Sequence, residues 1–186
     1  KTPETFEYKG KKYTPQSYAK EIGLVADDYV YITSFTHHPF YQPFVVEVPD
    51  NWAWQQAYNV PLDELVQTMN GAISKGFGIG WDADVSEANF RHKDGLAIVP
   101  ENWSTLNNTD KDNCFSKPCK QAEISPAIRQ QAFDNYETQD DHLMHIVGTA
   151  KDQNNTNYYI VKNSWGTDRN ECAGYFYASE AYVKYK

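Results

Sequence analysis

Two segments of β-type residues, separated by a short polar cluster, constrain the fold of this chain more than any other feature. The segments 142–148 and 157–163 are rich in Val, Ile and Tyr, and the turn-forming residues 151–156 lie between them. This pattern predicts a β-hairpin with a long loop. If the strands pair antiparallel, His142 lies opposite or nearly opposite Asn163. Directly opposed side chains have Cβ atoms about 4.5–5.5 Å apart, so the Asn163 amide can hold the His142 imidazole.

A histidine held in this way has a chemical use. An imidazole that a third group orients can act as a general base or as the cationic partner of a thiolate. Trp165 follows two residues after Asn163, and we expect it to cover the hydrogen bond between His142 and Asn163. A lone His on a strand is more often a core or surface residue, and an Asn at a strand end is usually a turn former. The functional hypothesis therefore rests on the whole pattern and not on either residue.

The wider pattern resembles a known family. The sequence Lys-Asn-Ser-Trp-Gly-Thr at 162–167, in frame with Asp-His at 141–142, resembles the His-and-Asn half of a papain-like cysteine peptidase site. Further stretches resemble the bleomycin hydrolase and aminopeptidase C branch of that family, and they cover most of the chain: 8–15, 27–30, 36–41, 48–52, 58–62 and 81–87.

The resemblance implies a fold and an activity. The fold class is α+β, with residues 1–186 forming the C-terminal portion of one papain-like domain, mainly its β-rich half, without the part that bears the Cys. The implied function is a cysteine peptidase, most simply an aminopeptidase, with His142 and Asn163 as catalytic residues and Trp165 as a supporting residue. The implied partners are peptide substrates and further copies of the same chain, and no cofactor is implied.

The nucleophile of such an enzyme has no counterpart in this sequence. In the resembled family, a Cys on a helix N-terminus near the start of the domain follows a Gln of the oxyanion hole. The cysteines here, Cys114, Cys119 and Cys172, are predicted to lie in loops, without the helix N-terminus or cationic flank that lowers a thiol pKa. We expect the Cys to come from an N-terminal chain of the same precursor that stays associated after internal proteolysis.

Three alternatives to a two-chain enzyme stay open at this point. The chain can be a fragment of a longer protein, or a catalytically inactive papain-like scaffold that serves as a binding or assembly protein. An unrelated β-rich carbohydrate-binding module would account for the many Trp and Tyr residues, but it explains none of the ordered motifs.

Several polar residues near the expected cleft are secondary candidates. Asp82, Asp84 and Glu87 are candidates for contact with a substrate amine or a cation. Asp141 either lines the cleft beside His142 or accepts hydrogen bonds from nearby backbone N–H groups.

The remaining histidines and the cysteines give no metal site. Adjacent residues on an extended chain point to opposite sides, so His37 and His38 are not expected to chelate one ion. We expect both in a structural loop, and His145 in the core or an interface. The cysteines lack paired C-x-x-C spacing, so no metal site is predicted.

Composition limits the remaining function classes. The 186 residues are 40% apolar and 15% aromatic, which predicts one folded domain with a sizeable core. A net charge of −8 argues against a nucleic-acid partner, and no apolar run approaches the roughly 20 residues of a membrane span. Cys114 and Cys119 can form a small disulfide or stay free. Together with three Asn-x-Ser/Thr triplets, at 102–104, 107–109 and 154–156, they favour an exported protein over a cytoplasmic one.

Local signals predict the other elements. Thr14 and Pro15 open a helix through about Ile22, Pro61 opens one that closes near Gly76, and Ser125 and Pro126 open one through about Phe133. Strands are predicted at 29–35 and 77–81.

Overall fold

A computed structural model describes residues 2–186, in two units that divide between Tyr31 and Ile32. The first unit contains strands β1 (Phe6–Tyr8) and β2 (Lys11–Tyr13), helix α1 (Pro15–Glu21) and the 3₁₀-helix η1 (Ala26–Asp28). The predicted first helix is confirmed with its cap, because the Thr14 side chain accepts from Ser17 N at 3.1 Å and the Thr14 N–H donates to Ser17 Oγ at 2.9 Å. Aromatic rings hold this unit together: Phe6, Tyr8, Tyr13 and Tyr18.

The strand predicted at 29–35 is largely wrong. Only Ile32–Thr33 forms a strand, β3, which pairs in parallel with β5 (Gln56–Asn59). Residues 29–31 have side chains of strong β propensity, but no described strand pairs with them and they are exposed, Val30 to 78%. β propensity takes effect only where a neighbouring strand supplies hydrogen bonds and a surface to pack against.

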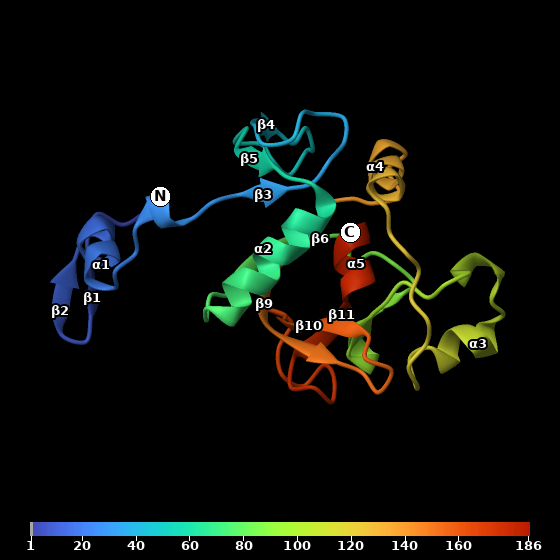
Figure 1. The fold of residues 1–186 in the computed structure, drawn as a ribbon. Helices are drawn as coiled ribbons and strands as arrows, with labels where there is room; N and C mark the ends of the chain where they lie inside the picture. Colours follow the sequence, from blue (N-terminus) through green and yellow to red (C-terminus); the bar gives the residue numbers. More distant parts are fainter. Residues whose placement is uncertain (1) are drawn as a thin grey trace. The chain divides into compact units, whose positions relative to one another are not determined.

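The second unit is built on a sheet of six strands (Figure 1). Its order is β6-β9-β10-β11-β8-β7, and its strands are β6 (Ile79–Ala83), β7 (Phe90–Arg91), β8 (Leu96–Ala97), β9 (His142–Lys151), β10 (Asn157–Lys162) and β11 (Tyr175–Ser179). The predicted hairpin is confirmed as the antiparallel pair β9–β10. The strand predicted at 77–81 starts two residues later, as β6, after the positive-φ Gly76 that follows the preceding helix.

Helices cover this sheet and fix its core. The predicted second helix is α2 (Leu62–Ser74), which packs on β6 and β9 through Leu62, Leu65 and Met69. Helix α5 (Glu180–Tyr185) follows β11 and contributes the buried Tyr182 to the same core. The predicted third helix is α4 (Pro126–Asp134), and Ser125 Oγ accepts from Ile128 N at its start.

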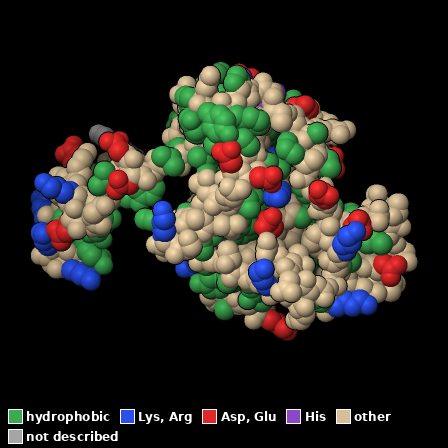
Figure 2. Space-filling view, viewed as in Figure 1, with side chains coloured by type: hydrophobic (Ala, Val, Ile, Leu, Met, Phe, Trp, Pro, Cys, Tyr) green, Lys and Arg blue, Asp and Glu red, His purple; other side chains and the backbone are tan. Residues whose placement is uncertain are grey.

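Shorter elements complete this unit. A three-stranded sheet has the order β3-β5-β4, where β4 is Pro43–Val45. Helix α3 (Asn108–Asn113) and the 3₁₀-helices η2 (His92–Asp94) and η3 (Trp103–Thr105) lie in the connection between β7 and α4. Hydrophobic side chains gather on the surface where Figure 1 places β4 and β5 (Figure 2), and the exposed aromatic residues of this region are Tyr41, Trp52, Trp54 and Tyr58. Within residues 2–186, none of the helices has the length and apolar character needed to cross a bilayer.

Candidate active site

The hairpin brings His142 and Asn163 together, although not as directly opposed ladder residues. His142 is the first residue of β9 and pairs with Ala83 of β6, whereas the β9–β10 ladder ends with Lys162 opposite His145. Asn163 is the first residue after β10, so its side chain is free to turn toward His142. The two side chains meet with His142 Nε2 at 2.8 Å from Asn163 Oδ1.

The hydrogen bonds around Asn163 determine which ring nitrogen of His142 carries a proton. Asn163 Oδ1 also accepts the backbone N–H of Ser164 at 2.7 Å, which fixes this atom as the amide oxygen. A carbonyl oxygen only accepts, so His142 Nε2 must be the donor. In the neutral ring, Nδ1 then carries the lone pair, and the hydrogen bond of the ring to the described residues runs through Nε2. His142 therefore offers a basic nitrogen on the side away from Asn163.

Trp165 covers this pair, as its position in the sequence predicts. Its indole stacks on the His142 ring with centroids 5.1 Å apart and planes 26° apart. Asn163 is only 7% exposed, and its Nδ2 is buried without a partner in the described part of the chain. The indole and the buried amide keep water away from the His142–Asn163 hydrogen bond, which strengthens it.

The loop from Asn163 to Tyr175 is held by an asparagine that the sequence analysis missed. Asn170 Oδ1 accepts from Cys172 N and Gly174 N, and Asn170 Nδ2 donates to the carbonyls of His92 and Tyr175. Gly174 has φ +84°, and its carbonyl accepts from Asn163 N at 3.1 Å. The Asn-x-x-x-Gly spacing is a turn signal that could have indicated this closure.

Asp141 and Asp84 accept hydrogen bonds from the segments beside the site. Asp141 Oδ1 accepts from Val85 N at 3.0 Å, and the Ser86 hydroxyl donates to Asp141 Oδ2. Asp84 is 3% exposed and accepts the backbone N–H groups of Ser86 and Gln139, both at 2.9 Å. These contacts tie the segment after β6 to the segment before β9, and they leave the Asp84 carboxylate buried.

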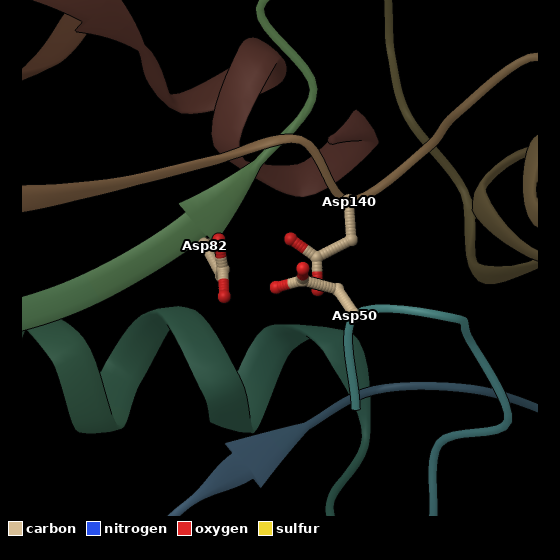
Figure 3. Close-up of side chains that lie close together, drawn as sticks. All are labelled: Asp50, Asp82 and Asp140. Carbon is tan, nitrogen blue, oxygen red and sulfur yellow. The ribbon is translucent and has the colours of Figure 1, made fainter. Parts of the chain in front are cut away.

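Asp82 lies instead in a group of three carboxylates. One oxygen from each of Asp50, Asp82 and Asp140 lies within 4.8 Å of the others (Figure 3). Burial, the hydrogen bond with Asp82 and the nearby negative charges raise the pKa of Asp140 to about 7. Exposed acidic groups often gather in this way without an ion, so the cluster alone does not define a metal site.

Each of the three cysteines is a free thiol outside the setting of a nucleophile. Cys114 lies at the C-terminal end of α3, and Cys172 lies in the loop that Asn170 holds. Burial and the neighbouring Cys114 raise the pKa of Cys119 to about 12, so Cys119 is a poor thiolate.

The other histidines occupy structural positions. His37 stacks on Phe133 and lies 3.1 Å from Gln130 Oε1 through Nδ1, while His38 stacks on Phe44. His145 is exposed on β9, so of the two predicted positions the core is wrong, while a position in an interface stays a prediction. It lies in a shallow surface pocket with Ile73, Phe77 and Val147, over Gly78.

A curled sheet that brings together a His, an Asn and a covering Trp, with helices on its flanks, defines a papain-like α+β fold. The model of the Peptidase C1-like family matches residues 4–185. This chain therefore belongs to the Peptidase C1-like family, and the predicted fold class is confirmed.

The solved structure of PepW supports the fold. PepW from Lactobacillus rhamnosis HN001 is 22% identical with a TM-score of 0.68, and the alignment covers 98% of this chain and 41% of PepW. This chain thus spans less than half of the length of PepW. Bromelain from Ananas comosus, solved with the inhibitor E64, is 25% identical over 61% of this chain and 35% of its own, at a TM-score of 0.34. A search among curated proteins found no match.

Proposed function

We propose that this chain is the His/Asn part of a cysteine peptidase, with the nucleophilic Cys supplied by an associated segment outside these 186 residues. One observation carries the proposal: His142 donates through Nε2 to Asn163, which leaves Nδ1 as the basic nitrogen of the neutral ring. The family to which the chain belongs supports the same chemistry.

The reaction follows from this geometry. His142 Nδ1 takes the proton of the incoming thiol, and the resulting thiolate attacks the carbonyl carbon of the scissile peptide bond. The C–N bond breaks as Nδ1–H gives its proton to the leaving amine. Water, deprotonated by Nδ1, then attacks the thioester carbon. The C–S bond breaks, the new carboxylic acid leaves, and Nδ1–H returns its proton to the sulfur. Asn163 holds the ring in place through both steps, and Trp165 keeps that hydrogen bond dry.

The substrates we propose are peptides with a free amino terminus. The sequence stretches that resemble the aminopeptidase C branch support this choice, and so does the negative net charge of −8, which favours cationic amines. We further propose that the missing Cys lies on an N-terminal chain of the same precursor, that the protein is a homo-oligomer, and that it is exported.

A second candidate function is a binding or assembly protein on an inactive papain-like scaffold. It is favoured by the surroundings of Cys114, Cys119 and Cys172, none of which matches those of a nucleophile. The intact arrangement of His142, Asn163 and Trp165 speaks against it, because a site without catalysis has no need for an oriented basic nitrogen.

An intact-mass measurement distinguishes these functions. The natively purified protein is treated with a thiol-directed epoxide inhibitor and then denatured. We expect an adduct on a segment outside residues 1–186, while this chain remains unmodified. A single unmodified species would favour the scaffold.

A matched set of variants tests the same point by activity. Replacing Cys114, Cys119 and Cys172 by Ser together is expected to leave peptide hydrolysis within about twofold of the parent, since none is placed to be activated. Loss of activity together with loss of the epoxide adduct would place the nucleophile on this chain and contradict the proposal.

A further inference from the structure

One buried histidine has no role in the reaction above. His92, the first residue of η2, is 8% exposed, and both of its ring nitrogens are buried without a hydrogen-bond partner among the described residues. An imidazole with two unsatisfied nitrogens destabilises a core in which a Phe would fit without that cost. Any contribution of the His92 ring to the site must therefore come from its packing against neighbouring side chains and not from hydrogen bonds.

The ring of His92 lies against the residue that covers the site. Its centroid is 4.9 Å from that of Trp165, with the two planes at 75°. Phe90 lies parallel to His92, at 17°, and also meets Trp165 at a right angle, 5.9 Å away. Trp165 in turn stacks on His142 at 5.1 Å. The indole is thus held between two buried perpendicular rings and the active-site imidazole.

The backbone of His92 supports the same loop. Its carbonyl accepts from Asn170 Nδ2 at 3.0 Å, and Asn170 also receives the N–H groups of Cys172 and Gly174. Trp165 and Asn163 lie at the start of the loop that Asn170 closes. His92 therefore contacts the Trp165 side chain through its ring and the Asn163–Tyr175 loop through its carbonyl.

The ring is also electrically suited to this position. Burial lowers the pKa of His92, and the positive charges of Arg169 and His142 lower it further. In its neutral form, His92 can pack on one side of the Trp165 indole. The other contact of that indole is His142, whose imidazole becomes charged during the proposed reaction. A second charged imidazole there would repel the first.

We propose that His92 is a positioning residue, whose buried ring fixes the indole of Trp165 over the hydrogen bond between His142 and Asn163. Edge-to-face aromatic contacts are specific in geometry, and a small number of them set the orientation of a partly exposed indole. The role of His92 in turnover rests on the proposed peptidase function, whereas its effect on Trp165 and His142 does not.

The test compares His92→Leu, which removes the flat ring and keeps an apolar side chain, with His92→Phe, which keeps a flat ring. The full protein is labelled with 5-fluorotryptophan, and the Trp165 resonance is assigned from Trp165→Phe. In His92→Leu we expect that resonance to shift and narrow as the indole gains motion. We also expect the Nε2–H proton of His142 to exchange with water about two- to tenfold faster. His92→Phe should restore both values, and His145→Leu, on an exposed ring, should change neither.

The outcomes separate the two proposals. If the peptidase assignment holds, kcat in His92→Leu falls about two- to tenfold with KM little changed, and His92→Phe recovers it. NMR changes without any measurable peptidase activity would support the positioning role and count against the proposed function. An unchanged Trp165 resonance and unchanged exchange in His92→Leu would overturn the positioning role, and so would a His92→Phe protein that behaves like His92→Leu. If His92→Leu does not fold, His92→Gln replaces it in the same comparison.

Discussion

His142 Nε2 donates to Asn163 Oδ1 across 2.8 Å, although the two residues are not paired in the β9–β10 ladder. The bond forms because the ladder ends at Lys162, which frees Asn163 to turn its side chain back over the start of β9. The Ser164 N–H fixes the amide orientation, and the amide fixes the tautomer of the imidazole.

Replacing His142 by Ala should abolish hydrolysis and leave the fold intact. The ring lies partly exposed at a strand end, so its removal leaves little cavity, while the base and acid of the proposed reaction disappear. We expect kcat/KM to fall by about 10³-fold or more in the full protein, with an unchanged circular dichroism spectrum. His145→Ala is the matched control on the same strand. Full activity in His142→Ala would refute the assignment of the catalytic histidine.

Asn163→Ala should lower kcat more than it changes KM. The variant removes the acceptor that orients His142, and misplacing a catalytic group by about 1 Å can cost about 100-fold in rate. We expect a loss in kcat of about 10- to 100-fold, measured by steady-state kinetics on a peptide substrate. Ser164→Ala keeps the backbone N–H that binds Asn163 and should retain activity. Equal losses in the two variants would show that the loop, and not the amide, is responsible.

Gly174→Ala should destabilise the protein and disturb the site. Gly174 has φ +84°, and a Cβ there would lie 2.5 Å from the Gly166 carbonyl oxygen. The carbonyl of Gly174 holds Asn163 N, so a shift of this backbone moves Asn163. We expect a loss of about 2–3 kcal/mol in the free energy of unfolding, measured by urea denaturation.

Gly76→Ala is the control for Gly174→Ala. Gly76 has φ +86°, but a Cβ there has nothing within 4 Å. This variant should therefore show only the conformational cost of a positive φ, about 1 kcal/mol. If both variants lose the same stability, the close approach to Gly166 is not important.

Asp140→Asn should reduce the dependence of stability on pH. The pKa of Asp140 is raised to about 7, mainly by burial and then by Asp82, so the folded state binds a proton that the unfolded state releases near pH 4. The folded protein therefore loses stability as pH rises from about 4 to 7. The amide of Asp140→Asn cannot ionise. We therefore expect its free energy of unfolding to exceed that of the parent by about 1–2 kcal/mol at pH 8 and by little at pH 4.

Chemical denaturation at the two pH values checks this prediction. The negative charge of Asp50 raises the pKa of Asp140 less than burial and Asp82 do. Asp50→Asn should therefore give a smaller gain in stability at pH 8 than Asp140→Asn. A gain of equal size at pH 4 and pH 8 would mean that ionisation of Asp140 is not its cause.

Much of this fold could be predicted from local sequence signals. Thr14, Ser125 and the apolar spacing from Leu62 to Met69 predict three of the helices that the structure contains, because capping and amphipathic periodicity act within a few residues. The hairpin of β9 and β10 is equally local, and with Trp165 it points to the site. The strand predicted at 29–35 is wrong because a strand requires a partner that local sequence cannot specify.

The candidate catalytic residues could also be predicted from the sequence. His142, Asn163 and Trp165 lie within 24 residues of one another, and the predicted hairpin brings them into contact. Other contacts of the site depend on long-range packing and could not be predicted from local sequence. This packing buried Asp84 against backbone N–H groups, gathered Asp82 with Asp50 and Asp140, and set His92 against Trp165 across 4.9 Å. These contacts join residues distant in the chain, and their geometry depends on how the sheet and its loops pack.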